Sequence, residues 1–328
     1  MIAYLSLLQT TFSDRLLVNE PLARYTSARV GGPADALLFA DSRQDLINMI
    51  TFLVQHELPY IVLGGGSNVL VSDAGLRCVV VINRARRIKF NEEGDPPTVW
   101  AESGASLGLV ARQAAVRGLS GLEWACGIPG TVGGAVIGNA GAHGADMASN
   151  LLVAEILHLN PQAVAIQPQQ STAMKGDELP KGLPVEEWSA QQCEFSYRTS
   201  AFKREAVKAV ILSAKLALQR STPQAVQEKM EAFTAYRRRT QPPGASVGSM
   251  FKNPPGDYAG RLIEAAGLKG TVIGGAQISP LHANFFINQG NATASDILAL
   301  IELARRTVGE KTGVQLELEI QLLGDYES

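Results

Sequence analysis

The sequence predicts an α+β fold that divides into two or three domains. Three observations lead to this class. Helical and extended patterns alternate early in the chain, glycine-dense segments interrupt its middle, and one long amphipathic helix with an alternating segment closes it. With 328 residues, 46% of them hydrophobic, the chain can bury a substantial core.

The first unit reads as strand, helix, strand. Residues 36–40 are extended, and Ser42 with Asp45 forms a weak capping box. The helix that follows carries apolar residues at helical spacing, namely Leu46, Ile47, Met49, Ile50, Leu53 and Val54. After Pro59, residues 60–63 form a strand that runs directly into glycine.

The middle of the chain continues this mixed pattern. We expect extended pieces at 78–82 and 99–101, a helix over about 107–117, a strand over 207–218 and a helix from 223 to about 238. Residues 157–188 are polar and rich in Gln, Pro and Gly, which predicts an irregular surface excursion.

The final domain carries the clearest amphipathic patterns. Thr293 and Asp296 cap a helix that ends near Gly309 and Gly313. Its apolar face consists of Ile297, Leu300, Ile301, Ala304 and Val308. Residues 314–322 then alternate apolar and polar, which predicts a strand whose polar face includes Glu319. On this pattern alone, Glu319 is more simply a solvated strand residue than a catalytic one.

Charge and cysteine content narrow the function classes. A formal charge of −2 and a pI near 6.1 argue against a nucleic-acid-binding surface. The apolar start lacks a preceding Lys or Arg, and no apolar run approaches the ~20 residues of a spanning helix, so neither a signal peptide nor a membrane partner is expected. Three scattered cysteines fit a reducing cytoplasm, and no metal site is expected.

Two glycine clusters suggest a phosphate-bearing cofactor. The first is Gly64-Gly65-Gly66-Ser67-Asn68, directly after a strand, and the second runs from Gly127 to Gly134. Glycines let consecutive backbone N–H groups converge on a phosphate. Neither cluster is a Rossmann fingerprint or a P-loop. Tight turns explain each cluster alone better than a ligand does, but together, with the extension 139–144, the two clusters favour a pyrophosphate between two loops.

The heptapeptide from Gly248 to Pro254 places Ser249 next to Lys252 and Asn253. No Gly-x-Ser-x-Gly elbow is present, and no Asp and His follow in the order such a hydrolase needs, so we interpret Ser249 as a proton donor and not as an acyl-accepting nucleophile. A plain loop serine before an Asn-Pro turn explains the heptapeptide equally well.

Several motifs together resemble the UDP-N-acetylenolpyruvoylglucosamine reductases (MurB). They comprise residues 26–35, 64–73, 127–144, 195–200, 248–254, 266–270, 282–285 and 316–320. They keep the family's order and approximate spacing over nearly the whole chain from residue 22. The resemblance implies an FAD-binding module of the vanillyl-alcohol oxidase and p-cresol methylhydroxylase (PCMH) type, followed by a C-terminal α+β substrate-binding domain.

The family's reaction follows from the same resemblance. NADPH reduces non-covalently bound FAD, and the enolpyruvyl ether of UDP-N-acetylglucosamine then receives a hydride and a proton to give UDP-N-acetylmuramate for peptidoglycan synthesis. Arg198 is implied to hold the substrate carboxylate, for which a guanidinium fork is suited. Glu319 is implied to work beside it in a protonated or hydrogen-bonded form, and Ser249 to deliver the proton.

The resemblance also assigns binding residues. FAD contacts are expected at Gly64, Gly65, Gly66, Ser67, Asn68, Gly127, Ile128, Pro129, Gly130, Thr131, Gly133, Gly134, Asn139 and Gly141. Substrate contacts are expected at Tyr197, Lys252, Asn253, His282 and Asn284, although local structural hydrogen bonding explains the last four equally well. The three arginines 237–239 are interpreted as favourable charges at a helix C-terminus.

Domain limits and subgroup can be stated in the same terms. We expect FAD-binding subdomains at 1–77 and 78–218 and a substrate-binding domain at 219–328, in a monomer. The stretch between Arg198 and Ser249 is too short for the extra tyrosine loop of one subgroup. Residues 160–188 are longer than the family's usual hairpin, and Leu318 replaces a frequent proline.

Two other functions remain open at this point. A covalent-flavin oxidase of the same superfamily is one, because Cys126 and His143 lie near the expected flavin loops. A catalytically silent nucleotide-sugar-binding flavoprotein is the other, although the retention of Arg198, Ser249 and Glu319 argues against it.

Overall fold

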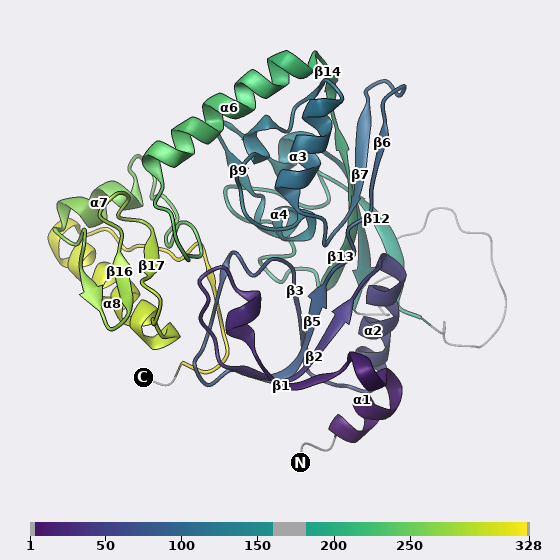
Figure 1. Ribbon diagram of the computed structural model, residues 1–328, viewed down its shortest axis with the longest axis horizontal. Helices are drawn as coiled ribbons and strands as arrows, with labels where there is room; N and C mark the ends of the chain where they lie inside the picture. Colours follow the sequence, from purple (N-terminus) through teal and green to yellow (C-terminus); the bar gives the residue numbers. More distant parts are fainter. Residues whose placement is uncertain (1–3, 160–181, 327–328) are drawn as a thin grey trace.

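A computed structural model describes residues 4–159 and 182–326 (Figure 1). Its first sheet has the order β1-β2-β5-β3, with β2, β5 and β3 parallel and β1 antiparallel at the edge. The strands are β1 (Leu17–Pro21), β2 (Pro33–Ala40), β3 (Tyr60–Leu63) and β5 (Leu76–Asn83). Helices α1 (Leu5–Phe12) and α2 (Arg43–Gln55) accompany this sheet, and the apolar side of α2 packs into the same core as β2 and β5.

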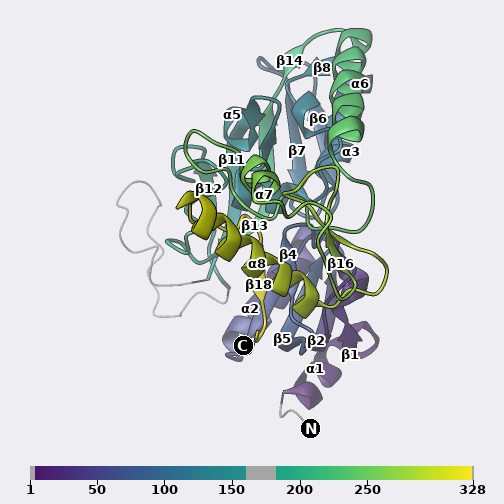
Figure 2. The same cartoon turned by 90° about the vertical axis from the view of Figure 1, so that its left-hand side faces the viewer.

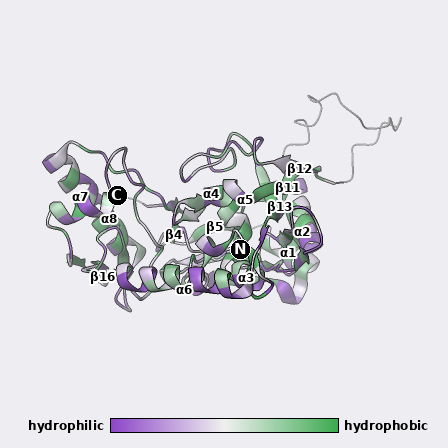
Figure 3. Ribbon diagram, turned by 90° about the horizontal axis from the view of Figure 1, so that it is seen from above, coloured by the Kyte–Doolittle hydropathy of each residue, from purple (hydrophilic) through white to green (hydrophobic). Residues whose placement is uncertain are grey.

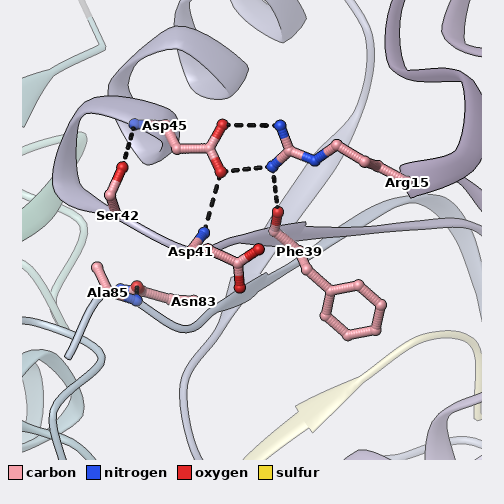
Figure 4. A network of polar contacts seen from close by, with 7 residues as sticks. All are labelled: Arg15, Phe39, Asp41, Ser42, Asp45, Asn83 and Ala85. Carbon is pink, nitrogen blue, oxygen red and sulfur yellow. Dashed lines mark hydrogen bonds and ion pairs between the residues drawn. The ribbon is translucent and has the colours of Figure 1, made fainter.

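The start of α2 is held from both sides. The Ser42 side chain accepts a hydrogen bond from the Asp45 N–H at 3.1 Å, as the capping pattern predicts. Arg15 Nη1 donates to Asp45 Oδ1 at 3.1 Å, and the second nitrogen bonds the other carboxylate oxygen and the Phe39 carbonyl (Figure 4). The helix N-terminus is thereby tied to the end of β2.

The second sheet is an antiparallel five-stranded sheet with the order β12-β11-β13-β7-β6. Its strands are β6 (Ile88–Asn91), β7 (Thr98–Glu102), β11 (Leu151–His158), β12 (Val185–Ser189) and β13 (Ala209–Ala217). Helices α3 (Leu107–Val116) and α4 (Val132–Gly138) share the apolar core of this sheet. Smaller elements are η3 (Glu123–Ala125), α5 (Met147–Asn150) and the strand pairs β8 (Leu119–Ser120) with β14 (Gln219–Arg220) and β9 (Gly141–Ala142) with β10 (Ala145–Asp146).

The long helix α6 (Pro223–Thr240) leads from the second sheet to the C-terminal part, along one side of the molecule (Figures 1 and 3). That part contains α7 (Ala259–Ala265), α8 (Ala294–Thr312) and the antiparallel strands β15 (Val272–Ile273), β16 (Ala276–Ile278) and β17 (Phe286–Asn288). The predicted capping box of α8, Thr293 with Asp296, is present, and Gly313 ends the helix with φ +74°.

Among the contacts that bind the C-terminal part to the first sheet region, two involve β4 and the residues that follow it. Strand β18 (Gln321–Leu323) pairs in parallel with β4 (Val69–Val71). Asp73, which follows β4, accepts hydrogen bonds from the N–H groups of Ala294 and Ser295 at the start of α8, at 2.8 and 2.9 Å. Figure 2 views the molecule from the side of α8, with β4 and β18 behind this helix. A carboxylate at a helix N-terminus is stabilising, so this contact fixes the start of α8 against the segment that follows β4.

Most predicted elements are confirmed within one or two residues, but two expectations are wrong. Residues 314–322 do not form one strand: only a bridge from Leu318 to Phe251 precedes the short β18. The segment 157–188 is not wholly irregular, because residues 157–158 continue β11 and 185–188 begin β12, and the two strands pair. Its centre, 160–181, lies outside the described residues.

The expected domain limit after residue 77 falls inside β5, which stays hydrogen-bonded to β2 and β3 up to Asn83. Helix α6 begins close to the expected limit at 219. Among the helices within 4–159 and 182–326, none has both the length and the apolar composition needed to cross a bilayer.

Candidate active site

A cavity of about 1100 Å³ lies where the two sheet regions and the C-terminal part meet. Its walls come from β3 and the loop after it (residues 60–69) and from residues 127–142 around α4. The end of α6 with the loop up to residue 249, and single residues such as Arg198 and Glu319, complete the lining. The cavity thus collects segments that are far apart in sequence. Its size exceeds what one small ligand requires.

Two glycine-containing loops that approach each other closely form one wall of this cavity. The loop 64–68 lies against the loop 127–131: Ser67 Oγ donates to the Pro129 carbonyl at 3.2 Å, and a Cβ on Gly65 would lie only 3.2 Å from the Cα of Gly130. Gly66 has φ +57° and Gly130 has φ +121°, which favour glycine. Every predicted FAD-contact residue except Asn139 lines the cavity.

Asn139 has a different position. It ends α4 in the left-handed region with φ +42°, and its side chain donates to Asp146 and to the Ser196 carbonyl at 3.1 Å each. The side-chain oxygen Oδ1 of Asn139 accepts a hydrogen bond from the Ala148 N–H at 3.0 Å. The side chain therefore braces the turn that carries Arg198, and it does not line the cavity.

Part of the cavity lining is apolar. Its lining includes residues 61–63 of β3 and residues 210 and 211 of β13. The glycine loops 64–68 and 127–134, called the glycine cradle below, and these apolar residues line the same cavity. This combination suits a dinucleotide with flat rings, because phosphates need N–H donors and rings need apolar walls.

Arg198 occupies a strained turn. Ser196 and Thr199 exchange two backbone hydrogen bonds at 3.1 and 3.2 Å, and Arg198 between them has φ +57°. A non-glycine residue in this region costs about 1 kcal/mol or more, which is commonly found at functional sites. This turn places Arg198 in the lining of the cavity.

Arg198 faces Glu319 there. Its Nε lies 2.9 Å from Glu319 Oε1, but that N–H is not aligned for a hydrogen bond, so the contact is an ion pair. Its terminal nitrogens donate to no side chain or backbone oxygen of the described residues. The fork thus remains available to a ligand in the cavity.

Glu319 is held by its main chain from three directions. Its N–H donates to the Met250 carbonyl at 3.0 Å, which ties it to the residue after Ser249. Its carbonyl accepts from Asn68 Nδ2 at 3.2 Å and from Lys203 Nζ at 3.0 Å. The side chain is only 16% exposed, so the solvated interpretation of Glu319 is wrong.

The charge state of Glu319 reflects two opposing effects. Burial raises its pKa, while the positive charges of Arg198, Lys203 and Lys252 lower it, and burial dominates. Glu319 therefore keeps a proton to higher pH than an ordinary glutamate.

Ser249 follows Gly248, which has φ +80°, and forms a bridge with Phe285. It lines the cavity together with Arg198 and Glu319. Its hydroxyl bonds to no other residue in the described ranges, so it is free to donate to a ligand. The structure thereby brings together the three residues that the resemblance singled out.

The residues predicted to contact substrate lie elsewhere. Lys252 pairs with Glu317, Asn253 accepts from the Ala259 N–H at 3.1 Å, and Tyr197 is 56% exposed. The imidazole Nδ1 of His282 accepts from the Asn284 N–H at 3.2 Å, and the buried Asn284 amide bonds the Phe251 backbone at 2.8 and 2.9 Å. None of the five lines the cavity, and their roles in binding remain predictions.

Two further cavity residues were not predicted. Arg237, together with Thr234, Arg238 and Gln241, forms the α6 face that lines the cavity, so Arg237 is more than a helix-end charge. Its guanidinium is half-buried and makes no ion pair with any described residue, and a Cβ on Gly127 would lie 3.2 Å from its Nε. The i, i+3, i+4, i+7 spacing of these four residues was the available signal. The second residue is Lys203.

Cys126 and His143 do not line the cavity. The Cys126 thiol lies 3.2 Å from Thr234 Oγ1, and the His143 ring stacks on Phe233 with centroids 3.9 Å apart. Both side chains are engaged with α6, and this favours a dissociable cofactor over a covalent one.

Comparison with known proteins adds independent information. Residues 34–160 match the family model of an FAD binding domain, and residues 240–323 match that of the C-terminal domain of UDP-N-acetylenolpyruvoylglucosamine reductase. The reductase of that name from Chloroflexus aggregans is 42% identical over 308 residues, 93% of this chain and 96% of the relative. That of Bacillus subtilis is 38% identical over 94% of both chains. The crystal structure of the enzyme from Thermus caldophilus aligns with a TM-score of 0.73 at 33% identity, over 94% of this chain and 98% of that one.

Proposed function

This chain belongs to the UDP-N-acetylenolpyruvoylglucosamine reductase family, and from that premise we propose that Arg198, Ser249 and Glu319 form its catalytic group. The enzyme uses NADPH and FAD to reduce the enolpyruvyl ether of UDP-N-acetylglucosamine to UDP-N-acetylmuramate, for peptidoglycan precursor synthesis. The observation that carries the assignment is that these three residues line one cavity with the glycine loops.

The residues of the cavity fit FAD. The loops 64–68 and 127–131 would hold its pyrophosphate, because both line the cavity and glycine offers backbone N–H donors without a Cβ. Arg237, which makes no ion pair with any described residue, would neutralise negative charge on the dinucleotide. Bound FAD supplies the hydride transfer from NADPH to the substrate. The apolar part of the cavity lining, residues 61–63 and 210–211, would contact a flat ring of the cofactor.

Arg198 and Ser249 divide the work on the substrate. Reduction at the terminal carbon leaves negative charge that spreads into the substrate carboxylate, and the free guanidinium fork of Arg198 would bind that carboxylate. The Ser249 hydroxyl would then donate a proton to the carbon that carries the ether oxygen. A serine is a weak acid, but the carbanion is a strong base and the two are positioned together.

Glu319 would share the substrate carboxylate with Arg198. Because burial raises its pKa, its protonated form can donate a hydrogen bond to that carboxylate. Glu319→Gln keeps a donor of similar size, so we expect a moderate loss, about 10-fold, in the rate at which substrate reoxidises the flavin. Stopped-flow absorbance measures this rate, and a parental rate would exclude the role.

The stability of the same variant should depend on pH. The pKa of Glu319 in the folded protein lies above its unfolded value of about 4.3. Between these two pKa values the folded protein binds more protons than the unfolded chain, so the parent loses stability as the pH rises through this interval. Glutamine does not ionise. We therefore expect the unfolding free energy of Glu319→Gln, relative to the parent, to be constant below about pH 4 and to increase above it. Denaturant titrations across pH provide the measurement, and a pH-independent difference would contradict the raised pKa.

Gly134→Ala tests the glycine cradle. A Cβ there meets only Thr131 Oγ1 at 3.6 Å, an ordinary contact, so the apoprotein should fold normally and gain up to about 1 kcal/mol of stability from helix propensity. Because Gly134 lines the cavity, we expect the added methyl group to weaken FAD binding about 10-fold. Flavin fluorescence titration measures this affinity. Gly108→Ala, in the first turn of α3 and outside the cavity, is the control, and equal affinity in both variants would contradict the role of the glycine loop in FAD binding.

An anaerobic titration tests the reaction as a whole. NADPH should bleach the flavin absorbance, and the enolpyruvyl substrate should restore it. A flavin that NADPH bleaches but the substrate does not recolour would reject the proposed reaction. Acid precipitation should release the yellow cofactor into the supernatant. We further propose a monomer that acts in the cytoplasm on this nucleotide sugar; gel filtration with light scattering tests the monomer.

A further inference from the structure

Lys203 is a half-buried lysine that the reaction outlined above does not use. Its Nζ lies in the same cavity as Arg198, Ser249 and Glu319. The Nζ donates a hydrogen bond to the main-chain carbonyl of Glu319 at 3.0 Å, and Asn68 Nδ2 donates to the same oxygen at 3.2 Å.

Three parts of the fold meet at this carbonyl. Asn68 belongs to the glycine loop after β3, Lys203 follows the strained Arg198 turn, and Glu319 belongs to the C-terminal part. On its other side, the Glu319 N–H is bound to the Met250 carbonyl. The lysine is thus the link between the Arg198 turn and the backbone of Glu319.

A neutral donor would suffice to hold a carbonyl, so the positive charge of Lys203 needs a separate reason. Burying a cation is costly unless opposite charge compensates it, and desolvation does lower the pKa of Lys203. The groups that face Lys203 and Glu319 are the cations Arg198 and Lys252 and the carboxylate Glu317. Three cations therefore surround two carboxyl groups, so this group keeps a net positive charge whether Glu319 is ionised or protonated, which favours an anionic ligand.

We propose that Lys203 is a positioning residue for the reduction: it holds the backbone of Glu319 against the Asn68 loop and keeps a positive charge beside the Glu319 carboxyl. The inference rests on the proposed function, in which Glu319 and Arg198 share the substrate carboxylate. Removing Lys203 should displace Glu319 and raise its pKa, because the lysine charge opposes the effect of burial.

The test compares three variants in the FAD-loaded enzyme. Lys203→Met removes donor and charge, Lys203→Arg keeps both, and Lys215→Met removes an exposed lysine of β13 outside the cavity as the control. Flavin content and the rate of flavin reduction by NADPH should stay within about 2-fold of the parent in all three. Reoxidation by the enolpyruvyl substrate should slow about 10-fold in Lys203→Met, the scale of a modest misplacement, and should recover in Lys203→Arg.

A second readout does not depend on turnover. The Glu319 carboxyl can be titrated by carbon-13 NMR, assigned by its loss in Glu319→Gln, and its midpoint should move to higher pH in Lys203→Met and not in the control. Should Lys203→Met fold poorly, Lys203→Gln, which lacks the charge but keeps a donor, should show the same upward movement.

The outcomes separate this inference from the proposed function. A parent enzyme that the substrate does not reoxidise would overturn both. A parent that turns over, with Lys203→Met matching its reoxidation rate or its Glu319 midpoint, would overturn the role of Lys203 alone. If Lys203→Met lost flavin content and both half-reaction rates to the same extent, Lys203 would have only a structural role.

Discussion

Ser249→Ala is expected to slow reoxidation of the flavin by the enolpyruvyl substrate by about 10²–10⁴-fold, the range for a missing general acid. Reduction of the flavin by NADPH should remain nearly parental, because the proposed proton transfer belongs only to the second half-reaction. The Ser249 hydroxyl has no partner among the described residues, so its removal leaves no unpaired group in the protein. Stopped-flow absorbance of the two half-reactions measures the difference.

Two further variants support the interpretation of this experiment. Ser249→Cys should recover part of the lost rate, because a thiol can also give up a proton. Ser221→Ala, an exposed serine before α6, should behave like the parent. If Ser249→Ala slowed both half-reactions equally, or reoxidised at the parental rate, Ser249 would be a structural loop residue.

Arg198→Lys is expected to retain FAD but to lose about 10²-fold in kcat/KM for the enolpyruvyl substrate. A lysine keeps the positive charge next to Glu319, yet it cannot form the two parallel hydrogen bonds that a guanidinium fork makes with a carboxylate. Because lysine and arginine are equally strained at φ +57°, the turn itself should be preserved. Steady-state kinetics with flavin content as the reference measures the loss.

Arg204→Lys is the matched control, since Arg204 lies six residues later and pairs with Glu194 at 2.7 Å outside the cavity. It should turn over at close to the parental rate because exposed pairs contribute little. Near-parental turnover by Arg198→Lys would remove Arg198 from carboxylate recognition.

Local signals predicted most of the secondary structure. Strand β3 was predicted with its observed bounds, and the capped starts of α2 and α8 were identified from Ser42, Thr293 and Asp296. These predictions succeed because a cap or a helical period depends on residues only three or four positions apart.

The alternating segment 314–322 shows where such reasoning stops. Alternation predicts that a strand has two faces, but pairing requires a neighbouring strand. Among the strands that the structure describes, only β4 offers one, to residues 321–323. The preceding residues instead follow bonds to Met250, Asn68 and Lys203. Glu319 consequently faces the cavity, although its pattern alone placed it in solvent.

The sequence by itself determined the α+β class, the glycine loops, the family and the chemical identity of Arg198, Ser249 and Glu319, because these depend on residue type and near spacing. Only the tertiary structure decided that the three residues share one cavity, that Asn139 braces the Arg198 turn, and that Arg237 and Lys203 join the site. The reason is physical: burial, the raised pKa of Glu319 and the junction at its carbonyl arise from contacts between residues as much as 251 positions apart.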